Sequence, residues 1–172
     1  MKPRKKEKWK KVGTLLYANK EGDLAFLVHK GMNPNKHEGV GEEYLTHFGW
    51  QDTTQLKNVI DVESFQDLGM DMYRDKNRIY FHYDMSDGGY FRIWTEDPAD
   101  FRMYGNYILY KDSVYYPRHG KTIADIKTFK TSDELGILGK DKNYFFQWGD
   151  TVSLEKLKQD VPAATLKKLM EL

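Results

Sequence analysis

The sequence predicts a mainly β fold of antiparallel meanders and hairpins in tandem, with short linking helices and a small helical cap at the C-terminus. Two observations carry this prediction. Aromatic residues make up 15% of the 172 residues, and they favour the half-buried surfaces of sheets. One hairpin unit recurs three times between residues 61 and 150, so the sheets should follow one another along the chain.

The chain begins with a strongly basic segment. Residues 1–11 carry seven Lys or Arg against one Glu, and we expect them to form a disordered tail. The apolar stretch Val12–Ala18 that follows is too short for the core of a signal peptide. We therefore expect a cytoplasmic protein without a membrane segment.

Residues 12–60 are predicted to form a hairpin followed by an irregular lobe. Two apolar runs, Leu15–Ala18 and Leu24–Val28, flank a short stretch that contains Asn and Gly, which is typical of a hairpin. Residues 30–41 are rich in Gly, Asn and Pro and predict a loop. In the ambiguous stretch that follows, a short helix could be lined by Leu45, Phe48 and Leu56.

Three copies of one unit follow, at residues 64–82, 100–120 and 128–150. Each copy opens with Phe, crosses a Gly-containing turn, reaches a basic residue followed by Asp, and closes with two aromatic residues. Asp and Asn suit a turn because their short side chains bond the local backbone. We predict one three-stranded meander for each copy and a structural role for the motif residues, which are Asp75, Asn77, Tyr80, Asp112, Tyr115, Asp141, Asn143 and Phe145.

Short helical elements are predicted between and after the copies. Asp61, Asp97 and Asp125 each precede the opening Phe by four residues, a spacing that indicates an N-capped helical turn. Residues 151–172 have apolar residues near helical spacing, and Pro162 should break them into two short helices. The whole chain is expected to form one globular domain.

These motifs resemble the DKNYY family, a bacterial repeat family named for this string. The resemblance covers residues 61–150 and lies in the Asp-Lys-Asn strings, the aromatics after them and the Asp-x-x-x-Phe spacing. The second copy departs from the pattern because it reads Lys-Asp-Ser-Val-Tyr-Tyr. The resemblance implies a non-catalytic scaffold, and some small members look like immunity proteins encoded beside secreted toxins.

The sequence predicts no catalytic residue, no metal site and no cofactor. Cysteine is absent, and the five histidines have no pair at the helical spacing of a metal site. The stretch Asp84–Gly89 resembles the start of a calcium loop, but the twelfth position, which needs Glu, is Thr95. A hairpin turn accounts for the same residues. No complete phosphate-loop or nucleophile motif occurs.

An acidic, aromatic stretch is the predicted binding region. Residues 61–100 hold ten acidic against four basic residues, and exposed Tyr and Trp among carboxylates are typical of a surface that receives a basic partner. The candidate partner-binding residues are Asp84, Asp87, Tyr90, Phe91, Trp94, Glu96 and Asp97.

We expect a monomeric immunity protein that neutralises a cognate secreted toxin, such as a basic nuclease, by direct binding. The alternative is a repeat module that binds a peptide or glycan at a cell surface. Nucleic acid is not the expected partner, because the acidic body would repel phosphate even though the basic tail contains Trp9.

Overall fold

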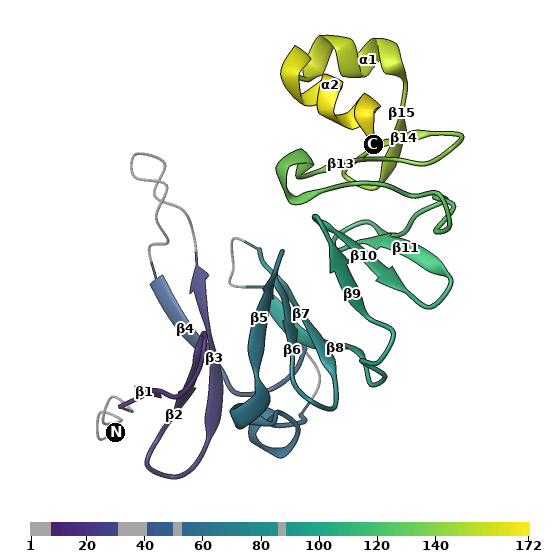
Figure 1. Cartoon of the computed structure of the whole chain (residues 1–172). Coiled ribbons are helices and arrows are strands. Elements are labelled where there is room, and N and C mark those ends of the chain that lie inside the picture. Colours follow the sequence, from purple (N-terminus) through teal and green to yellow (C-terminus); the bar gives the residue numbers. More distant parts are fainter. Residues whose placement is uncertain (1–7, 31–40, 50–52, 86–88) are drawn as a thin grey trace. The chain divides into compact units, whose positions relative to one another are not determined.

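The computed structural model describes residues 8–30, 41–49, 53–85 and 89–172. Within these residues it confirms the mainly β class, with four antiparallel sheets and two α-helices near the C-terminus (Figure 1). The chain divides into two compact units, Met1–Pro98 and Ala99–Leu172, where the sequence predicted one domain. No helix among the described residues has the length and apolar character needed to cross a membrane.

The first sheet of unit 1 contains the predicted hairpin. Its strands lie in the order β1-β2-β3-β4, and their bounds are β1 Lys10–Lys11, β2 Leu16–Ala18, β3 Leu24–Lys30 and β4 Gly41–Leu45. In β3, Leu24, Phe26 and Val28 alternate with residues of the opposite face and enter the core. Ala25 and Leu27, on the opposite face, are buried as well, so this part of β3 is covered on both faces.

One prediction for this region is wrong. Lys10 and Lys11 do not belong to a disordered tail, because they pair with Ala18 and Tyr17 as an edge strand. The stretch that the sequence left ambiguous holds, among its described residues, β4 and the short 3-10 helix η1, Leu56–Asn58. Residues 1–7 and the predicted loop at 31–40 lie outside the described residues.

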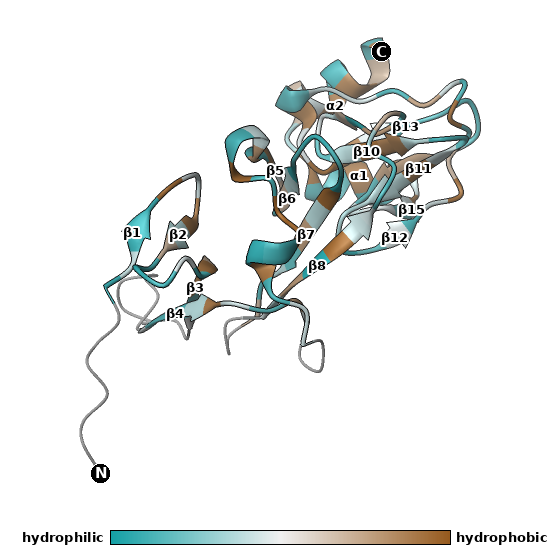
Figure 2. Cartoon of the chain, turned by 90° about the horizontal axis from the view of Figure 1, so that it is seen from below, coloured by the Kyte–Doolittle hydropathy of each residue, from teal (hydrophilic) through white to brown (hydrophobic). Residues whose placement is uncertain are grey.

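The second sheet of unit 1 is the first copy of the repeat. A single turn, η2 Val62–Ser64, leads into four strands in the order β5-β6-β7-β8, whose bounds are β5 Gln66–Gly69, β6 Met72–Arg74, β7 Ile79–Tyr83 and β8 Tyr90–Thr95. The predicted meander is thus extended by β8. Hydrophobic and hydrophilic residues alternate along this strand (Figure 2), as expected for a strand with one buried face.

The two sheets of unit 1 share one aromatic core. Phe26 of β3 stacks on Phe91 of β8 with ring centroids 4.4 Å apart. Phe65, at the start of the first copy, stacks on Tyr73 at 5.5 Å. Offset stacking of this kind adds to the stabilisation from apolar burial, so the core joins the N-terminal hairpin to the first copy.

Unit 2 contains the second and third copies. The second copy forms a sheet in the order β12-β11-β10-β9, with bounds β9 Arg102–Tyr104, β10 Tyr107–Tyr110, β11 Ser113–Tyr116 and β12 Gly120–Lys121. The third forms a sheet in the order β13-β14-β15, with bounds β13 Leu138–Lys140, β14 Phe145–Gln147 and β15 Asp150–Val152. A single bridge between Lys130 and Lys140 stands where the other copies have their first strand.

The structure confirms the two C-terminal helices, α1 Leu154–Asp160 and α2 Ala163–Glu171. Ser153 caps α1 by accepting a hydrogen bond from the backbone N–H of Lys156. Pro162 separates the helices. Leu157 and Leu169 pack with Leu135 and Leu138 of the third copy, so this end of the repeat array is covered by a helical cap.

Candidate partner-binding surfaces

The Asp of the first copy forms a hydrogen-bonded clasp. Asp75 is 1% exposed, and its carboxylate accepts bonds from the backbone N–H groups of Asn77 and Arg78, both at 2.8 Å. It also accepts bonds from the backbone N–H of Asp61 at 2.9 Å and the hydroxyl of Tyr80 at 2.6 Å. Because burial of an unpaired carboxylate is costly, these four donors explain why an acid is tolerated here.

A second layer of contacts ties the clasp to the segment before the opening Phe. The ammonium group of Lys76 lies 2.6 Å from the carboxylate of Asp61, and the backbone N–H of Lys76 donates to the hydroxyl of Ser64 at 3.0 Å. Hydrogen bonds from Lys76 and Ser64 lower the pKa of Asp61 to about 2. Asp61 also caps η2, as its spacing predicts.

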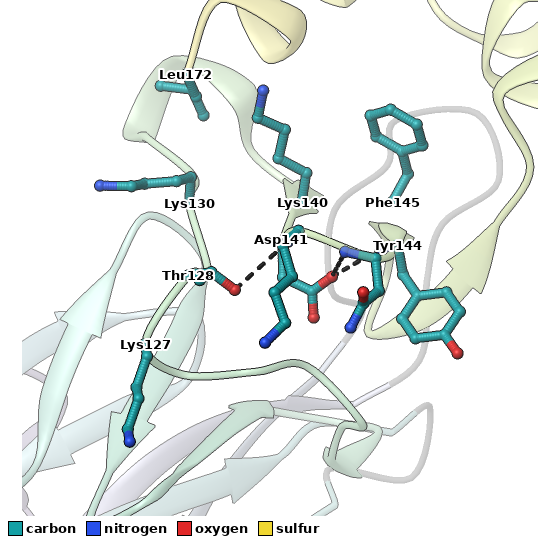
Figure 3. Close-up of a pocket in the computed structure, with 10 residues that line it drawn as sticks. Lys127, Thr128, Lys130, Lys140, Asp141, Tyr144, Phe145 and Leu172 are labelled. Carbon is teal, nitrogen blue, oxygen red and sulfur yellow. Dashed lines mark hydrogen bonds between the residues drawn. The ribbon is translucent and has the colours of Figure 1, made fainter.

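The third copy repeats this clasp (Figure 3). Asp141 accepts bonds from the backbone N–H groups of Asn143 at 2.8 Å and Tyr144 at 2.7 Å. It accepts a further bond from the backbone N–H of Asp125 at 2.8 Å, and Lys142 pairs with the Asp125 carboxylate at 2.9 Å. These bonds give Asp141 and Asn143 the same structural part that Asp75 and Asn77 have in the first copy.

The second copy lacks this clasp. Its Asp112 is exposed and accepts a hydrogen bond from the hydroxyl of Ser113 at 2.9 Å. Lys111 and Asp112 form a two-residue turn between β10 and β11, with Lys111 at φ +53°. Tyr115 is half-buried, and its ring lies 6.4 Å from that of Tyr110. The loss of Lys-Asn therefore shortens the turn and leaves the carboxylate at the surface.

The aromatic pairs of the first and third copies are offset by one residue. Tyr80 and Phe146 each follow the clasp Asp by five residues, and each packs on the opening Phe of its copy at 5.9 Å, Tyr80 on Phe65 and Phe146 on Phe129. The aromatic pairs were aligned from the sequence with Phe145 in the position of Tyr80, and this alignment is therefore wrong. Phe145 instead packs against the helical cap.

The predicted partner-binding residues do not form one cluster. Asp84 and Tyr90 lie near the start of β8, whereas Trp94, Glu96 and Asp97 lie at its other end, about 13–23 Å away at the rise of an extended strand.

Two members of the predicted set need separate comment. Phe91 is fully buried against Phe26 and Phe48, so its assignment as a contact residue is wrong. The alternation of β8 places its ring in the core. Asp87 lies outside the described residues.

The start of β8 lies at an acidic end of the β5–β8 sheet. His82 donates its backbone N–H to the carbonyl of Asp71 at 2.9 Å, which brings the β5–β6 turn beside the end of β7. The rings of Tyr83 and Tyr90 stack at 5.4 Å. Burial and the charges of three nearby carboxylates raise the pKa of Tyr73. We define the acidic tip as these carboxylates and the stacked pair, namely Asp67, Asp71, Asp84, Tyr83 and Tyr90.

A basic concavity in the third copy was missed by sequence reasoning. Its volume is about 470 Å³, and lysines lie on one side of it with Tyr144 and Phe145 on the other (Figure 3). We define the lysine concavity by its lining, which is Lys127, Thr128, Lys130, Lys140, Asp141, Lys142, Asn143, Tyr144, Phe145 and Leu172. The lysines are spread over sixteen residues that also contain three acids, so local net charge gave no signal.

Two of the described histidines each lie near a single carboxylate. His82 lies 4.0 Å from Asp71, and His119 lies 3.6 Å from Asp150. His47 bonds the hydroxyl of Thr46. Within the described ranges no group of three His, Asp or Glu side chains is placed to hold a metal ion. No family model, curated protein or solved structure matches this chain.

Proposed function

We propose that this protein is a non-catalytic binding module of the DKNYY type. In this proposal it acts in the bacterial cytoplasm as an immunity protein that neutralises a cognate toxin with a basic surface. The observation that carries the proposal is the acidic tip of unit 1, where the Tyr83–Tyr90 pair and three carboxylates occur towards one end of the β5–β8 sheet.

The chemistry of the acidic tip suits a basic protein surface. Tyr83 and Tyr90 are half-buried, so each ring is held by its neighbours and still presents area to a partner. Rigid aromatic side chains of this kind are common binding hot spots. The carboxylates of Asp67 and Asp84 are exposed towards the same end of the sheet and would attract a basic partner before contact. Binding over the toxin's active surface would block access of its substrate.

The proposal is tested by co-expression with the product of the neighbouring open reading frame. We expect the two proteins to copurify and the toxicity of the neighbour to be suppressed. The double variant Asp67→Lys, Asp84→Lys should weaken binding by on the order of tenfold or more, because it places like charges against the basic partner. Biolayer interferometry at two salt concentrations measures this loss.

The matched control is Glu155→Lys with Asp160→Lys, which changes the net charge by the same amount at two exposed acids of α1 in unit 2 and should leave binding unchanged. A neighbour that is not toxic, or that the wild-type protein neither binds nor neutralises, would contradict the immunity role. Equal binding by the wild type and the double variant would contradict the assignment of the surface.

A further inference from the structure

We propose that the lysine concavity of the third copy is a second binding site, which takes a short acidic peptide segment bearing an aromatic side chain. This inference does not depend on the acidic tip or on the immunity role. It rests on which lysine ammonium groups already form contacts within the fold, on a comparison of the first and third copies, and on the chemistry of the residues that line the concavity.

Two of the four lysines that line the concavity already form a hydrogen bond or an ion pair within the fold. The ammonium group of Lys140 donates to the carbonyl of Met170 at 3.0 Å, a contact suited to the C-terminal end of a helix. Lys142 pairs with Asp125. Lys127 and Lys130 are exposed, and their ammonium groups have no hydrogen bond or ion pair within the described residues. Two cations on one wall therefore remain available to a ligand.

Comparison with the first copy shows that Lys127, Lys130 and Tyr144 are not needed to form the clasp. The positions of Lys127, Lys130 and Tyr144 correspond to Glu63, Gln66 and Arg78, counted from the clasp Asp and the opening Phe. Both copies nevertheless make the same backbone bonds to the Asp carboxylate. The third copy thus carries two cations and an aromatic ring where the same local fold forms without them.

The lining fits an anion that also has an apolar group. Tyr144 is 47% exposed, and Phe145 and Leu172 add apolar surface. The side chain of Asn143 is exposed as well and offers donors to a carboxylate or a peptide group. An acidic side chain would lie at Lys127 and Lys130 while an aromatic neighbour contacts Tyr144.

The charge favours a peptide over a nucleic acid. Nucleic-acid binding depends on several simultaneous phosphate contacts, whereas the concavity has only two lysines, Lys127 and Lys130, whose ammonium groups form no hydrogen bond or ion pair within the described residues. Residues 99–172 hold twelve basic and ten acidic residues, a net charge of only +2. A segment with two or three carboxylates matches this site better than a polyphosphate chain.

The experiment titrates the full chain into fluorescein-labelled probes and follows fluorescence anisotropy. The first probe is a peptide that alternates Glu with Tyr, and the second is the same peptide with Gln in place of Glu. The third is an oligothymidine strand. We expect the Glu-Tyr peptide to bind at least tenfold more tightly than either of the other probes, and its binding to weaken as salt is added.

The decisive variant, which we call the copy-swap variant, gives the third copy the residues of the first at three positions: Lys127→Glu, Lys130→Gln and Tyr144→Arg. Because the first copy folds with these residues, the variant should fold, and circular dichroism checks this. Its affinity for the Glu-Tyr peptide should fall at least tenfold. The control, Lys156→Gln with Lys158→Gln, changes the net charge by the same amount on α1 and should leave affinity within twofold.

Three results would overturn the proposal. One is equal binding of the Glu and Gln peptides, or of the wild type and the copy-swap variant. Another is tighter binding of oligothymidine through the same lysines, which would identify a nucleic-acid site. The last is concentration-dependent self-association that the copy-swap variant abolishes without any peptide binding, which would identify a second copy of this chain as the occupant. Failure of toxin binding would leave these readouts unaffected.

Discussion

The first and third copies use the same motif to build clasps of different strength. Asp75 is buried and has four donors, one of them the hydroxyl of Tyr80. Asp141 is half-buried and has three backbone donors, and Phe146 stands in the place of Tyr80. The same local geometry can therefore contribute unequally to the free energy of unfolding in the two copies, because the cost of disrupting it depends on burial.

The largest effect is expected from Asp75→Ala. The substitution leaves three backbone N–H groups and the Tyr80 hydroxyl without their acceptor in a buried site, which should lower the free energy of unfolding by about 3–4 kcal/mol. Urea unfolding monitored by tryptophan fluorescence measures this. A loss below about 1 kcal/mol would mean that water or other groups satisfy these donors.

Asp141→Ala should cost less, about 1–2 kcal/mol. The same backbone donors lose their acceptor, but the site is half-buried, so water can replace the carboxylate. The same urea experiment checks this value. A cost equal to that of Asp75→Ala would show that burial does not separate the two clasps.

Tyr80→Phe tests the donor that distinguishes the copies. Loss of the 2.6 Å bond to Asp75 should cost about 1 kcal/mol, the typical net value of such a bond. The reciprocal Phe146→Tyr supplies a hydroxyl near Asp141 and should cost less than about 0.5 kcal/mol. Thermal unfolding of both variants measures the difference, and the reverse ranking would contradict the account of the Asp75 clasp.

Acid should reveal the ion pair between Lys76 and Asp61. The folded state lowers the pKa of Asp61 from 3.8 to about 2, so its stabilising effect is present above about pH 4 and is lost as the pH falls towards 2. Lys76→Gln removes the main cause of the lowered pKa. Its destabilisation relative to the wild type should therefore be visible at pH 5 and vanish near pH 2, as followed by thermal melts.

The smallest effect is expected in the second copy. Asp112 is exposed and has no clasp, so Asp112→Ala should change the free energy of unfolding by less than about 0.5 kcal/mol. Urea unfolding in parallel with Asp141→Ala makes the comparison direct. A larger cost would show that the short turn depends on this carboxylate.

Local features of the fold were predictable from the sequence, whereas pairings between distant segments were not. The clasp turns, the cap at Asp61 and the break at Pro162 each depend on residues a few positions apart. The strand at Lys10–Lys11 and the stack of Trp9 on Tyr44, at 5.3 Å, depend on a partner elsewhere in the chain.

The same distinction explains the results at the candidate surfaces. The sequence identified Asp84 and Tyr90 but missed Asp67 and Asp71, because their positions depend on strand pairing. The β5–β6 turn places Asp71 beside β7, and the pairing of β5 with β6 places Asp67 opposite Tyr73. It missed the lysine concavity because the bridge between Lys130 and Lys140 brings two distant segments together. The error of one residue at Phe145 arose from aligning the copies on aromatic pairs, whereas the clasp Asp fixes the register.

Gly139 limits how freely the copies can be exchanged. It occupies the position of Tyr73 in the first copy, and a Cβ atom there would lie 2.6 Å from the Cζ atom of Phe129. In the first copy the corresponding ring, Phe65, instead stacks on Tyr73. Exchange of this position alone would therefore bring a side chain for which Phe129 leaves no room. Recombination between copies should succeed for surface positions such as 127, 130 and 144, so new binding specificities can arise by exchange of loops while each copy keeps its own core.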